Sequence, residues 1–478
     1  MADRSRAWQG DAVGARLVEG TAVSGTSARL LAGGGDTIVA IASPEGRGAL
    51  ALIRLTGPHA LAIARALGAT TSRPRTARRV HLRHPESGVA LDEAVVTTFV
   101  GPHSFTGEDV VEMSTHGGRV VPTHVVAACV HAGARLALPG EFTRRAVMNG
   151  KMDLVQAEAV ADLIDARTTA MQQQALAQLD GGLSRRLLAL RDDVIHLEAL
   201  IAYDIDFPEE DDGPIAPARI LSAARALRDA LDALLATAPR AAMLRDGVLV
   251  VIAGPPNAGK SSLFNALLGH SRALVTPLAG TTRDAIDALL DRAPVPLRLV
   301  DTAGLRDTAD ALERLGIEVS ESYLADAQIV FACGASQDAI AHACEAVSRH
   351  STATIVPVFT KADMLDAKAE RDTRFSYVSA ETGEGLATLL SRVDLLVATL
   401  PAAPADQVVI TRERHQRGLR EARDEVALFL DGWSSGALPA PVAASHLLSA
   451  REALSELVGS ISIDDVLDRV FADFCIGK

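Results

Sequence analysis

Hydrophobic and polar positions change their spacing several times along the chain, and each change marks a different kind of structure. From residue 36 to about 150, short apolar runs rich in β-branched residues alternate with turns. Strands mixed with helices in this way are typical of an α+β domain. The pattern predicts strands over 37–42, 49–54, 93–100 and 109–113, and helices near 58–67 and 121–132.

The next segment is helical. Residues 153–203 contain no proline and carry apolar residues at mostly helical spacing. The glycine pair at 181–182 is expected to break or bend this run. After a Pro-Ala-Ala-Pro linker at 401–404, helical spacing returns. Outside the first run, helices are expected over 216–237, 408–431, 439–458 and 463–474.

A second mixed region separates the two helical stretches. Residues 248–253 form a continuous apolar run, as in a buried parallel strand, and 262–268 have helical spacing. The runs 297–300 and 354–359 predict further strands. The helical stretches can pack as one bundle, with this α/β domain inserted at a loop, or as two separate domains. We favour the single bundle.

The fold class expected from these patterns is a multidomain α/β protein. Its first residues mix arginines with acidic residues and contain no apolar signal region, and the acids argue against a transit peptide. They are expected to be a disordered extension, or to follow a start codon placed too early. The expected parts are the extension 1–35, an α+β domain 36–151, a helical segment 152–245, the inserted domain 246–398 and a second helical segment 399–478.

Composition and charge restrict the function. Of the 478 residues 48% are hydrophobic but only 3% are aromatic, so the cores must be built from Ala, Leu and Val. A net charge of −13 argues against a broadly basic nucleic-acid-binding surface, although not against a local basic patch. The four cysteines form no CxxC pair, which indicates neither a zinc site nor a disulfide framework. The same cysteine pattern predicts a reducing cytoplasmic location. No membrane span is expected, because no apolar run approaches the ~20 residues that a span needs.

One octapeptide constrains the chemistry more than any other feature. Gly-Pro-Pro-Asn-Ala-Gly-Lys-Ser at 254–261 is a complete G-x-x-x-x-G-K-S loop between the predicted strand 248–253 and the predicted helix 262–268. Backbone N–H groups at such a helix start bind phosphate oxygens. Lys260 is expected to reach the β- and γ-phosphates, and the Ser261 hydroxyl to bind Mg²⁺. The alternative is a glycine turn with a surface lysine. It does not explain why all four fixed positions of the motif occur between a predicted strand and a predicted helix.

Two further motifs complete a nucleotide-hydrolysing domain. Asp301-Thr-Ala-Gly304 follows a predicted strand at the usual distance from a P-loop, and its Asp can hold Mg²⁺ through water. Thr282, in Gly280-Thr-Thr-Arg-Asp284, is the candidate Mg²⁺-binding threonine, although a lone threonine is more often a turn residue. The position after Gly304 is Leu305, which cannot orient water. Glu313 is a candidate for that task.

The base is indicated by Thr360-Lys-Ala-Asp363 after the strand 354–359. One carboxylate can accept both N–H groups of guanine, which suits Asp363, and the Lys361 stem can cover the purine. Guanine-binding domains normally have Asn where Thr360 stands, so one amide that braces the loop is expected to be missing. Ser379-Ala380 follows at a suitable distance to lie beneath the base. A monovalent cation near Asn257 and the carbonyls of 276–280 can supply charge that an Arg finger supplies elsewhere.

Several segments together resemble one family along almost the whole chain from residue 36. They are Pro-Glu-Gly-Arg-Gly at 44–48, Ser-Phe-Thr-Gly-Glu-Asp at 104–109, His-Gly-Gly at 116–118, Pro-Gly-Glu-Phe at 139–142, 151–159, 205–208, the nucleotide motifs and the terminal Phe-Cys-Ile-Gly-Lys at 474–478. The chain is similar to the bacterial tRNA-modifying GTPases called MnmE or TrmE.

The resemblance implies an N-terminal folate-binding and dimerisation domain, a split helical domain and an inserted P-loop G domain. It implies a homodimer that forms a heterotetramer with an FAD-dependent subunit and acts on tRNA. The product would carry a carboxymethylaminomethyl or aminomethyl group at C5 of the wobble uridine, with the carbon from a tetrahydrofolate derivative. Hydrolysis of GTP would be activated by K⁺-dependent dimerisation of the G domains.

The resemblance also implies roles for individual residues. Glu313 would be the catalytic carboxylate, and Cys475 is either an active-site thiol or a buried apolar residue. Mg²⁺ would be held by Ser261 and Thr282. Folate contacts would be Arg54, Glu112, Lys151 and Lys478; K⁺ ligands Asn257, Thr276, Leu278 and Thr281; and GTP contacts Gly254, Asn257, Ala258, Gly259, Lys260, Ser261, Ser262, Thr276, Pro277, Leu278, Ala279, Gly280, Thr281, Thr282, Asp301, Thr302, Ala303, Gly304, Thr360, Lys361, Ala362, Asp363, Ser379, Ala380 and Glu381.

The sequence departs from the family pattern at Thr360 and around 333–355, where the G domain is expected to be shortened. Two alternatives therefore remain. A nucleotide-switched scaffold without hydrolysis is motivated by Leu305 and Thr360. A ribosome-assembly GTPase shares the nucleotide motifs, but gives no reason for the N-terminal domain or the terminal Cys-Ile-Gly-Lys.

Overall fold

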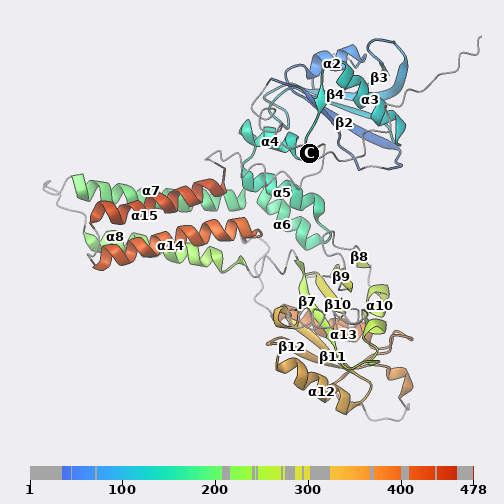
Figure 1. Ribbon diagram of the computed structural model, residues 1–478, viewed down its shortest axis with the longest axis vertical. Helices are drawn as coiled ribbons and strands as arrows, with labels where there is room; N and C mark the ends of the chain where they lie inside the picture. The colour runs from blue at the N-terminus through green and yellow to red at the C-terminus, as the bar shows by residue number, and fades with distance from the viewer. Residues whose placement is uncertain are drawn as a thin grey trace, which may run out of the picture. The chain divides into compact units, whose positions relative to one another are not determined.

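The computed structural model describes two compact units, one within Met1–Lys151 and Phe471–Lys478 and the other within Met152–Val470 (Figure 1). None of the described helices is long and apolar enough to cross a membrane. The described residues are 35–44, 46–69, 73–206, 216–238, 243, 246–270, 273–274, 286–292, 295–301, 323–365, 371–399, 409–435, 439–459 and 477. The expected extension over 1–35 and helix over 463–474 lie outside this set except for residue 35.

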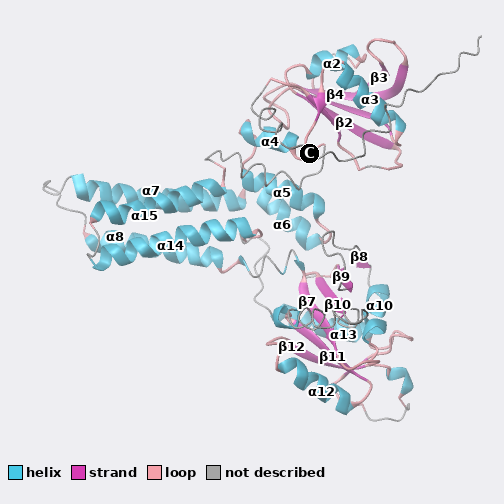
Figure 2. Ribbon diagram, in the orientation of Figure 1, coloured by secondary structure: helices cyan, strands magenta, loops and turns pink. Residues whose placement is uncertain are grey.

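The N-terminal unit is built on a six-stranded sheet with the order β3-β4-β5-β2-β1-β6. Figure 2 shows strands of this sheet in magenta, with the helices of the unit in cyan. All neighbouring strands are antiparallel except β1 and β6. The elements are β1 (Ile38–Ile41), β2 (Leu50–Thr56), α2 (Ala60–Ala66), β3 (Arg78–Arg83), β4 (Ala90–Phe99), β5 (Val110–His116), α3 (Val120–His131), β6 (Arg135–Leu136) and α4 (Glu141–Met148).

The two faces of this sheet have separate cores. Helices α2 and α3 cover one face, where Ile53, Leu55 and Met113 are fully buried. On the other face Ile38 and Ala40 pack against Phe142 of α4. The four predicted strands and two predicted helices are confirmed within a few residues. Strands β3 and β6 and helix α4 were not predicted, because β3 and α4 are rich in charged residues and β6 has two residues.

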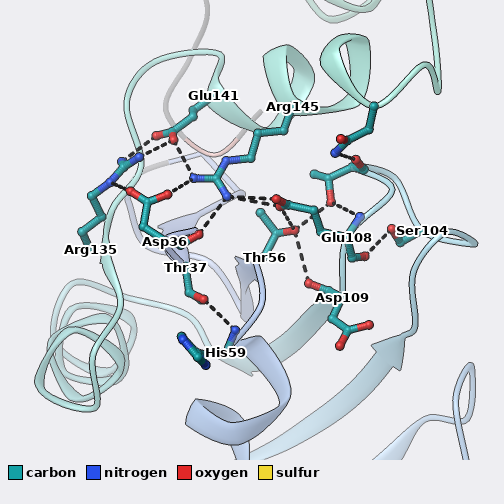
Figure 3. A network of polar contacts seen from close by, with 12 residues as sticks. Asp36, Thr37, Thr56, His59, Ser104, Glu108, Asp109, Arg135, Glu141 and Arg145 are labelled. Atoms are coloured by element: carbon teal, nitrogen blue, oxygen red, sulfur yellow. Dashed lines mark hydrogen bonds and ion pairs between the residues drawn. The ribbon is translucent and has the colours of Figure 1, made fainter. Parts of the chain in front are cut away.

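A network of charged residues holds α4 against the sheet (Figure 3). Arg135 donates to both carboxylate oxygens of Glu141, at 2.6 and 2.8 Å. Arg145, one turn further along α4, contacts Asp36 at 2.7 Å and Glu108 at 3.2 Å. The hydroxyl of Thr56 on β2 donates to Glu108 at 3.1 Å. The network therefore joins the start of the sheet, the loop before β5 and α4.

The helical domain draws its helices from both sides of the nucleotide-binding region. Helices α14 and α15 pack against each other, and against α8 and α7 respectively (Figure 1). One hydrophobic core contains Leu187 and Leu231 from the first segment and Phe429 and Leu454 from the second. The favoured single bundle is thus confirmed. The bounds are α5 (Leu154–Asp165), α6 (Thr169–Leu179), α7 (Gly182–Asp206), α8 (Pro217–Leu235), α14 (Glu413–Ser435) and α15 (Ala440–Leu457).

The predicted break at 181–182 is confirmed, because α6 ends at Leu179 and α7 begins at Gly182, but the run also has an earlier break that was not predicted. Helix α5 ends at Asp165, and α6 starts anew after Thr168. The Thr168 hydroxyl accepts a hydrogen bond from Met171 N at 3.2 Å, as an N-cap does, and this local bond competes with continuation of the helix.

The inserted α/β domain, which the sequence predicts to be the G domain, has a seven-stranded sheet with the order β13-β12-β11-β7-β10-β9-β8. The pairs formed by β9 are antiparallel and the others are parallel. The stretch 333–355, where shortening was expected, lies in a complete strand–helix–strand unit whose helix is capped by Ser336. The elements are β7 (Val248–Ala253), α10 (Lys260–His270), β8 (Ala273–Leu274), β9 (Ile286–Leu290), β10 (Leu297–Asp301), β11 (Ile329–Gly334), α12 (Gln337–Ser348), β12 (Thr354–Phe359), η2 (Ala362–Met364), β13 (Ser376–Tyr377) and α13 (Leu386–Thr399).

The charged network predicts a pH-dependent stability of α4. Burial by itself would raise the pKa of Glu141, but hydrogen bonds and charge from Arg135 and Arg145 hold it below its ordinary value of 4.5. The ionised carboxylate therefore stabilises the fold above pH 4.5, and this contribution is lost as the pH falls further. Glu141→Gln should lower the opening free energy of α4 by ~3–5 kcal/mol at neutral pH, since it breaks a buried ion pair.

Hydrogen–deuterium exchange of the α4 amides measures this difference at neutral and acidic pH. The exposed pair of Glu93 with Arg79 provides the control, because Glu93→Gln should cost at most ~1 kcal/mol. An unchanged difference between Glu141→Gln and the parent protein below pH 4 would contradict the role given to the carboxylate charge.

Candidate nucleotide-binding site

The G-x-x-x-x-G-K-S loop lies between β7 and α10, as its sequence context predicts. Strand β7 is buried along its whole length between β11 and β10. At Gly254, whose φ is +152°, a Cβ would lie 2.3 Å from Cys333 O at the end of β11, so no side chain fits there. Asn257 and Gly259 also have positive φ, of 61° and 78°. These conformations turn the loop back over the start of α10, where free N–H groups favour an anion.

The two charged residues predicted for phosphate and metal binding both lie at the C-terminal end of the central parallel strands β7 and β10. Lys260 is only 7% exposed, and its Nζ donates to Gly254 O at 3.0 Å and Pro255 O at 2.9 Å. The ammonium group is thus kept inside the loop. Asp301 ends β10, is fully buried, and pairs in register with Ile252 of the neighbouring β7. Its carboxylate and the Ser261 hydroxyl offer the hard oxygen donors that Mg²⁺ prefers.

A pocket of about 560 Å³ adjoins the P-loop on the side of the predicted base-binding motifs. It brings together three segments that are far apart in sequence: the start of α10, the loop after β12 and the loop after β13. Among its residues, Leu263, Asn265, Ala266, Met364 and Val378 were not predicted. Asn265 and Ala266 lie three and four positions after Ser262, and helical periodicity alone could have placed them on the same face. The lining is Gly259, Ser262, Leu263, Asn265, Ala266, Thr360, Lys361, Asp363, Met364, Val378, Ala380 and Glu381.

Backbone hydrogen bonds fix the two base-side loops to each other. Ala362 N donates to Val378 O at 3.0 Å, and Val378 N donates to Phe359 O at 2.9 Å. Ser379 is fully buried, and its Oγ accepts from Thr382 N at 3.2 Å, which closes the turn beneath the pocket. Lys361 and Asp363 remain exposed on the pocket side. The main chain therefore sets the loop geometry, and the two charged side chains are left for a ligand.

The expectation that the base-binding loop lacks a bracing hydrogen bond is wrong, because the Thr360 side chain supplies one. Its side chain is buried, and Oγ1 lies 2.7 Å from Ala258 O in the P-loop and 3.1 Å from Gly334 O. A hydroxyl has one proton, and Ala258 O is the nearer of its two possible acceptors. The hydroxyl proton is therefore donated to Ala258 O. Thr360 ties the base loop directly to the phosphate loop.

The predicted folate residues of the N-terminal unit are partly brought together. Arg54 and Glu112 face each other on β2 and β5 and form an ion pair at 2.8 Å. The guanidinium lies 5.3 Å from the ring centre of Phe105 and 5.8 Å from that of Phe142. These two rings were not predicted as site residues, because their proximity depends on the packing of a loop and of α4 on the sheet.

The chain terminus also lies at this unit. A Cβ at Gly477 would be 2.4 Å from Ile41 O, at the end of β1, and the preceding residue Ala40 pairs with Arg54. Lys151 is exposed, and its Nζ donates to Pro102 O at 3.0 Å. Arg54, Glu112 and the two phenyl rings thus lie around the strand pair β2–β5. Such a set of groups suits a ligand that has an aromatic ring with polar edges and a carboxylate tail.

Several predicted residues lie outside the described part of the chain, and their positions stay predictions. Within the described part, no cluster of His, Cys, Asp and Glu could hold a metal ion by itself. Cys333, beneath the P-loop, is unsuited to thiol chemistry because burial raises its pKa to about 12. The residues outside are Thr276, Pro277, Leu278, Ala279, Gly280, Thr281, Thr282, Thr302, Ala303, Gly304, Glu313, Cys475 and Lys478.

A glycine loop at the end of a central parallel strand, a buried Asp on the next strand and a Lys-x-Asp pocket define a P-loop nucleotide-binding domain of the GTPase class. A family described as the MnmE helical domain matches residues 154–475, and one described as the GTP-binding protein TrmE N-terminus matches 37–151. The chain belongs to the MnmE family.

Full-length relatives carry the same family name. A tRNA modification GTPase MnmE from Azoarcus sp. (strain BH72) is 43% identical over 93% of this chain and 98% of its own length. One from Laribacter hongkongensis (strain HLHK9) is 42% identical over 93% and 99%. The solved G domain of the T. maritima FeoB iron transporter aligns at 23% identity and a TM-score of 0.26, covering 31% of this chain and 98% of that one.

The Thr360 brace predicts a specific loss of nucleotide affinity. Thr360→Val keeps the side-chain shape but leaves the buried Ala258 carbonyl without its donor, which costs about 1–3 kcal/mol. Nucleotide dissociation constants should rise about tenfold for a loss in the middle of that range. Thr360→Ser keeps the hydroxyl and should bind within about twofold of the parent. Titration with a fluorescent GDP analogue measures both; equal affinity of the Val and Ser variants would disprove the brace.

Proposed function

We propose that the chain is a GTP hydrolase that acts in tRNA modification. With an FAD-dependent partner, it would add a carboxymethylaminomethyl or aminomethyl group to C5 of the wobble uridine of certain tRNAs, using a folate one-carbon unit. The observation that carries the proposal is the pocket in which the phosphate loop, the Lys361–Asp363 loop and the Ser379 turn meet. Membership of the MnmE family, over both its N-terminal and helical parts, supports the rest.

Guanine recognition follows from the hydrogen-bonding pattern of the base. The Asp363 carboxylate can accept from N1–H and from the N2 amino group, which adenine does not offer together. The aliphatic stem of Lys361 covers one face of the purine, and Ala380 lies on the lining beneath it. The phosphates take the N–H groups of residues 257–262, and Lys260 exchanges its carbonyl partners for phosphate oxygens.

Two cations fit the oxygen donors at the phosphate side. Mg²⁺ would be held by Ser261 and Thr282, with Asp301 acting through water, and supplies charge neutralisation at the phosphates when bound. K⁺ would be held by Asn257 together with Thr276, Leu278 and Thr281. Asn257 sits at a turn of the P-loop with positive φ, where its side-chain oxygen can approach the α- and β-phosphates. Glu313 would orient the attacking water, which Leu305 cannot do.

The one-carbon unit would be bound at the N-terminal domain. Glu112 can accept N–H groups of a pterin, and Arg54, Lys151 and Lys478 can meet carboxylates. The ion pair of Arg54 with Glu112 orients both side chains when no ligand is present. Gly477 lies against β1, which supports the terminal Lys478 and Cys475 as members of this site. We propose a cytoplasmic homodimer, which joins the FAD-dependent subunit as a heterotetramer.

The cation proposal makes a kinetic prediction. GTP hydrolysis should be at least about tenfold faster in KCl than in NaCl of equal ionic strength, because a positive charge at the transferred phosphate is worth roughly 10³–10⁵ in rate. Glu313→Ala should lower kcat about 10²- to 10⁴-fold with little change in nucleotide affinity. Phosphate release measures both, and Glu345→Ala on the exposed face of α12 is the control.

Equal rates in the two salts would overturn the cation assignment. Negligible phosphate release at high protein concentration in KCl would instead favour the alternative, a nucleotide-switched scaffold, for which Leu305 is the motivating residue.

The tRNA proposal is tested in cells. Deletion of the protein should abolish the modified wobble uridines, as measured by mass spectrometry of digested tRNA. A copy with Glu313→Ala should fail to restore them, whereas the control Glu345→Ala should restore them fully. Unchanged uridines in the deletion strain would favour another cellular role, such as ribosome assembly.

A further inference from the structure

The chain returns from the G domain to the helical domain through residues 409–415, which we call the return segment. Val409 and Ile410 bury their side chains, and the segment also makes polar contacts with residues that precede it by more than 170 positions in the chain. Gln178 of α6 is 3% exposed, and its Nε2 donates to Thr411 Oγ1 at 2.9 Å and to Val409 O at 3.3 Å. Ile410 N donates to Thr237 Oγ1 at 3.2 Å, just after α8. The outgoing and returning chains are thus joined where the G domain is inserted.

A buried carboxylate forms the centre of these contacts. Glu158 of α5 accepts two parallel hydrogen bonds from Arg414, both at 2.9 Å, and lies 2.6 Å from His415 Nε2. The side chains of Glu158, Arg414 and His415 are 2%, 17% and 0% exposed. One helical turn further along α5, Asp162 pairs with Arg412 at 2.5 Å. Two carboxylates on one face of α5 therefore hold the return segment.

The ionisation of Glu158 is strongly favoured by this arrangement. Burial would raise its pKa, but the hydrogen bonds and charges of His415 and Arg414 outweigh it and lower the pKa to about 2. The charge is present throughout the physiological pH range. A carboxylate removed from water in this way tolerates few other arrangements, because any shift of the return segment leaves it without its partners.

The bundle also has an apolar source of cohesion. The hydrophobic core that joins the two helical segments includes fully buried residues such as Leu187, Phe429 and Leu447. Apolar packing of that kind holds helices together but tolerates small sliding. A buried charge pair adds little stability over apolar packing, but it is costly to separate, so it favours the one arrangement in which both charges are paired. The cluster is better suited to fixing a position than to holding the fold.

Helix α5 also follows directly in sequence on the last residues of the N-terminal domain. It begins at Leu154, three residues after the candidate folate residue Lys151. Its first turn is closed by a capping box between Asp153 and Gln156, and Gln156 Nε2 also donates to Leu179 O at 2.9 Å. A stiff helix therefore runs from the end of the N-terminal domain to the side chains that hold the return segment.

We infer that Glu158 is a positioning residue that couples the nucleotide state of the G domain to the reaction at the N-terminal domain, by locking the return segment onto α5. The inference rests on the proposed function. It assigns the coupling to one physical junction, at which a displacement of the chain leaving the G domain must move α5 or break the ion pairs.

The test uses the full-length protein with its partner and tRNA, and compares Glu158→Gln with the parent. The amide keeps the side-chain volume but removes the charge that pairs with Arg414. The KM and kcat for GTP should stay within about twofold, whereas the uridines modified per GTP hydrolysed should fall about tenfold, a usual size for coupling between two sites. Hydrogen–deuterium exchange at 409–415 should become faster.

Matched variants separate coupling from damage to the fold. Glu198→Gln breaks the half-exposed pair with Arg451 in the same bundle and should change neither ratio nor exchange at 409–415. Fluorescence of Trp433, packed on Phe429, reports whether the bundle is folded. If Glu158→Gln does not fold, Asp162→Asn is used in its place, because the ion pair of Asp162 with Arg412 is partly exposed. The same fall in uridines modified per GTP hydrolysed is expected for this variant.

Faster exchange at 409–415 with an unchanged ratio of modification to hydrolysis would overturn the inference. So would a parallel fall of hydrolysis and modification, which would show that the residue supports the G domain alone. Failure of the parent protein to modify tRNA refutes the proposed function, and is distinguishable because it does not depend on residue 158.

Discussion

The nucleotide site depends on one close approach of main chain to main chain. The P-loop leaves β7 directly beside the end of β11, with room for no more than the hydrogen of Gly254 next to Cys333 O. This contact places Gly334 and the residue that follows the next strand, Thr360, against the loop. Phosphate-binding and base-binding segments therefore share one support. A side chain at residue 254 would separate them, so the glycine is required for both halves of the site.

Thr360 shows how the same constraint can be met by a different functional group. Its hydroxyl has a single proton, which is donated to the P-loop carbonyl of Ala258, because that oxygen lies nearer than Gly334 O. The β-branched side chain is buried and has few rotamers, so the bond costs little side-chain entropy. A threonine at this position thus fulfils the bracing requirement that the sequence pattern assigns to an amide.

The helical domain divides two tasks between two kinds of interaction. Its hydrophobic core, drawn from residues on both sides of the G domain, supplies cohesion. The buried charges of Glu158, Arg414 and His415 supply position, because they have partners in only one arrangement. A domain inserted into another must be attached at a defined orientation if its state is to matter elsewhere. The polar contacts lie where the inserted domain's chain returns.

The sequence by itself determined the features that depend on neighbours along the chain. The P-loop with its flanking strand and helix, the strand ending at Asp301 and most helices follow from spacing and turn chemistry, which are local. Only the tertiary structure decided the contacts between distant segments, such as Thr360 with Ala258, Arg54 with Glu112 and Glu158 with His415. Strand register and helix packing set these pairs, and neither leaves a periodic signal. The same reason hid α4, whose Arg145 pairs with the distant Asp36, and β3, whose Arg79 pairs with Glu93 on the neighbouring strand β4.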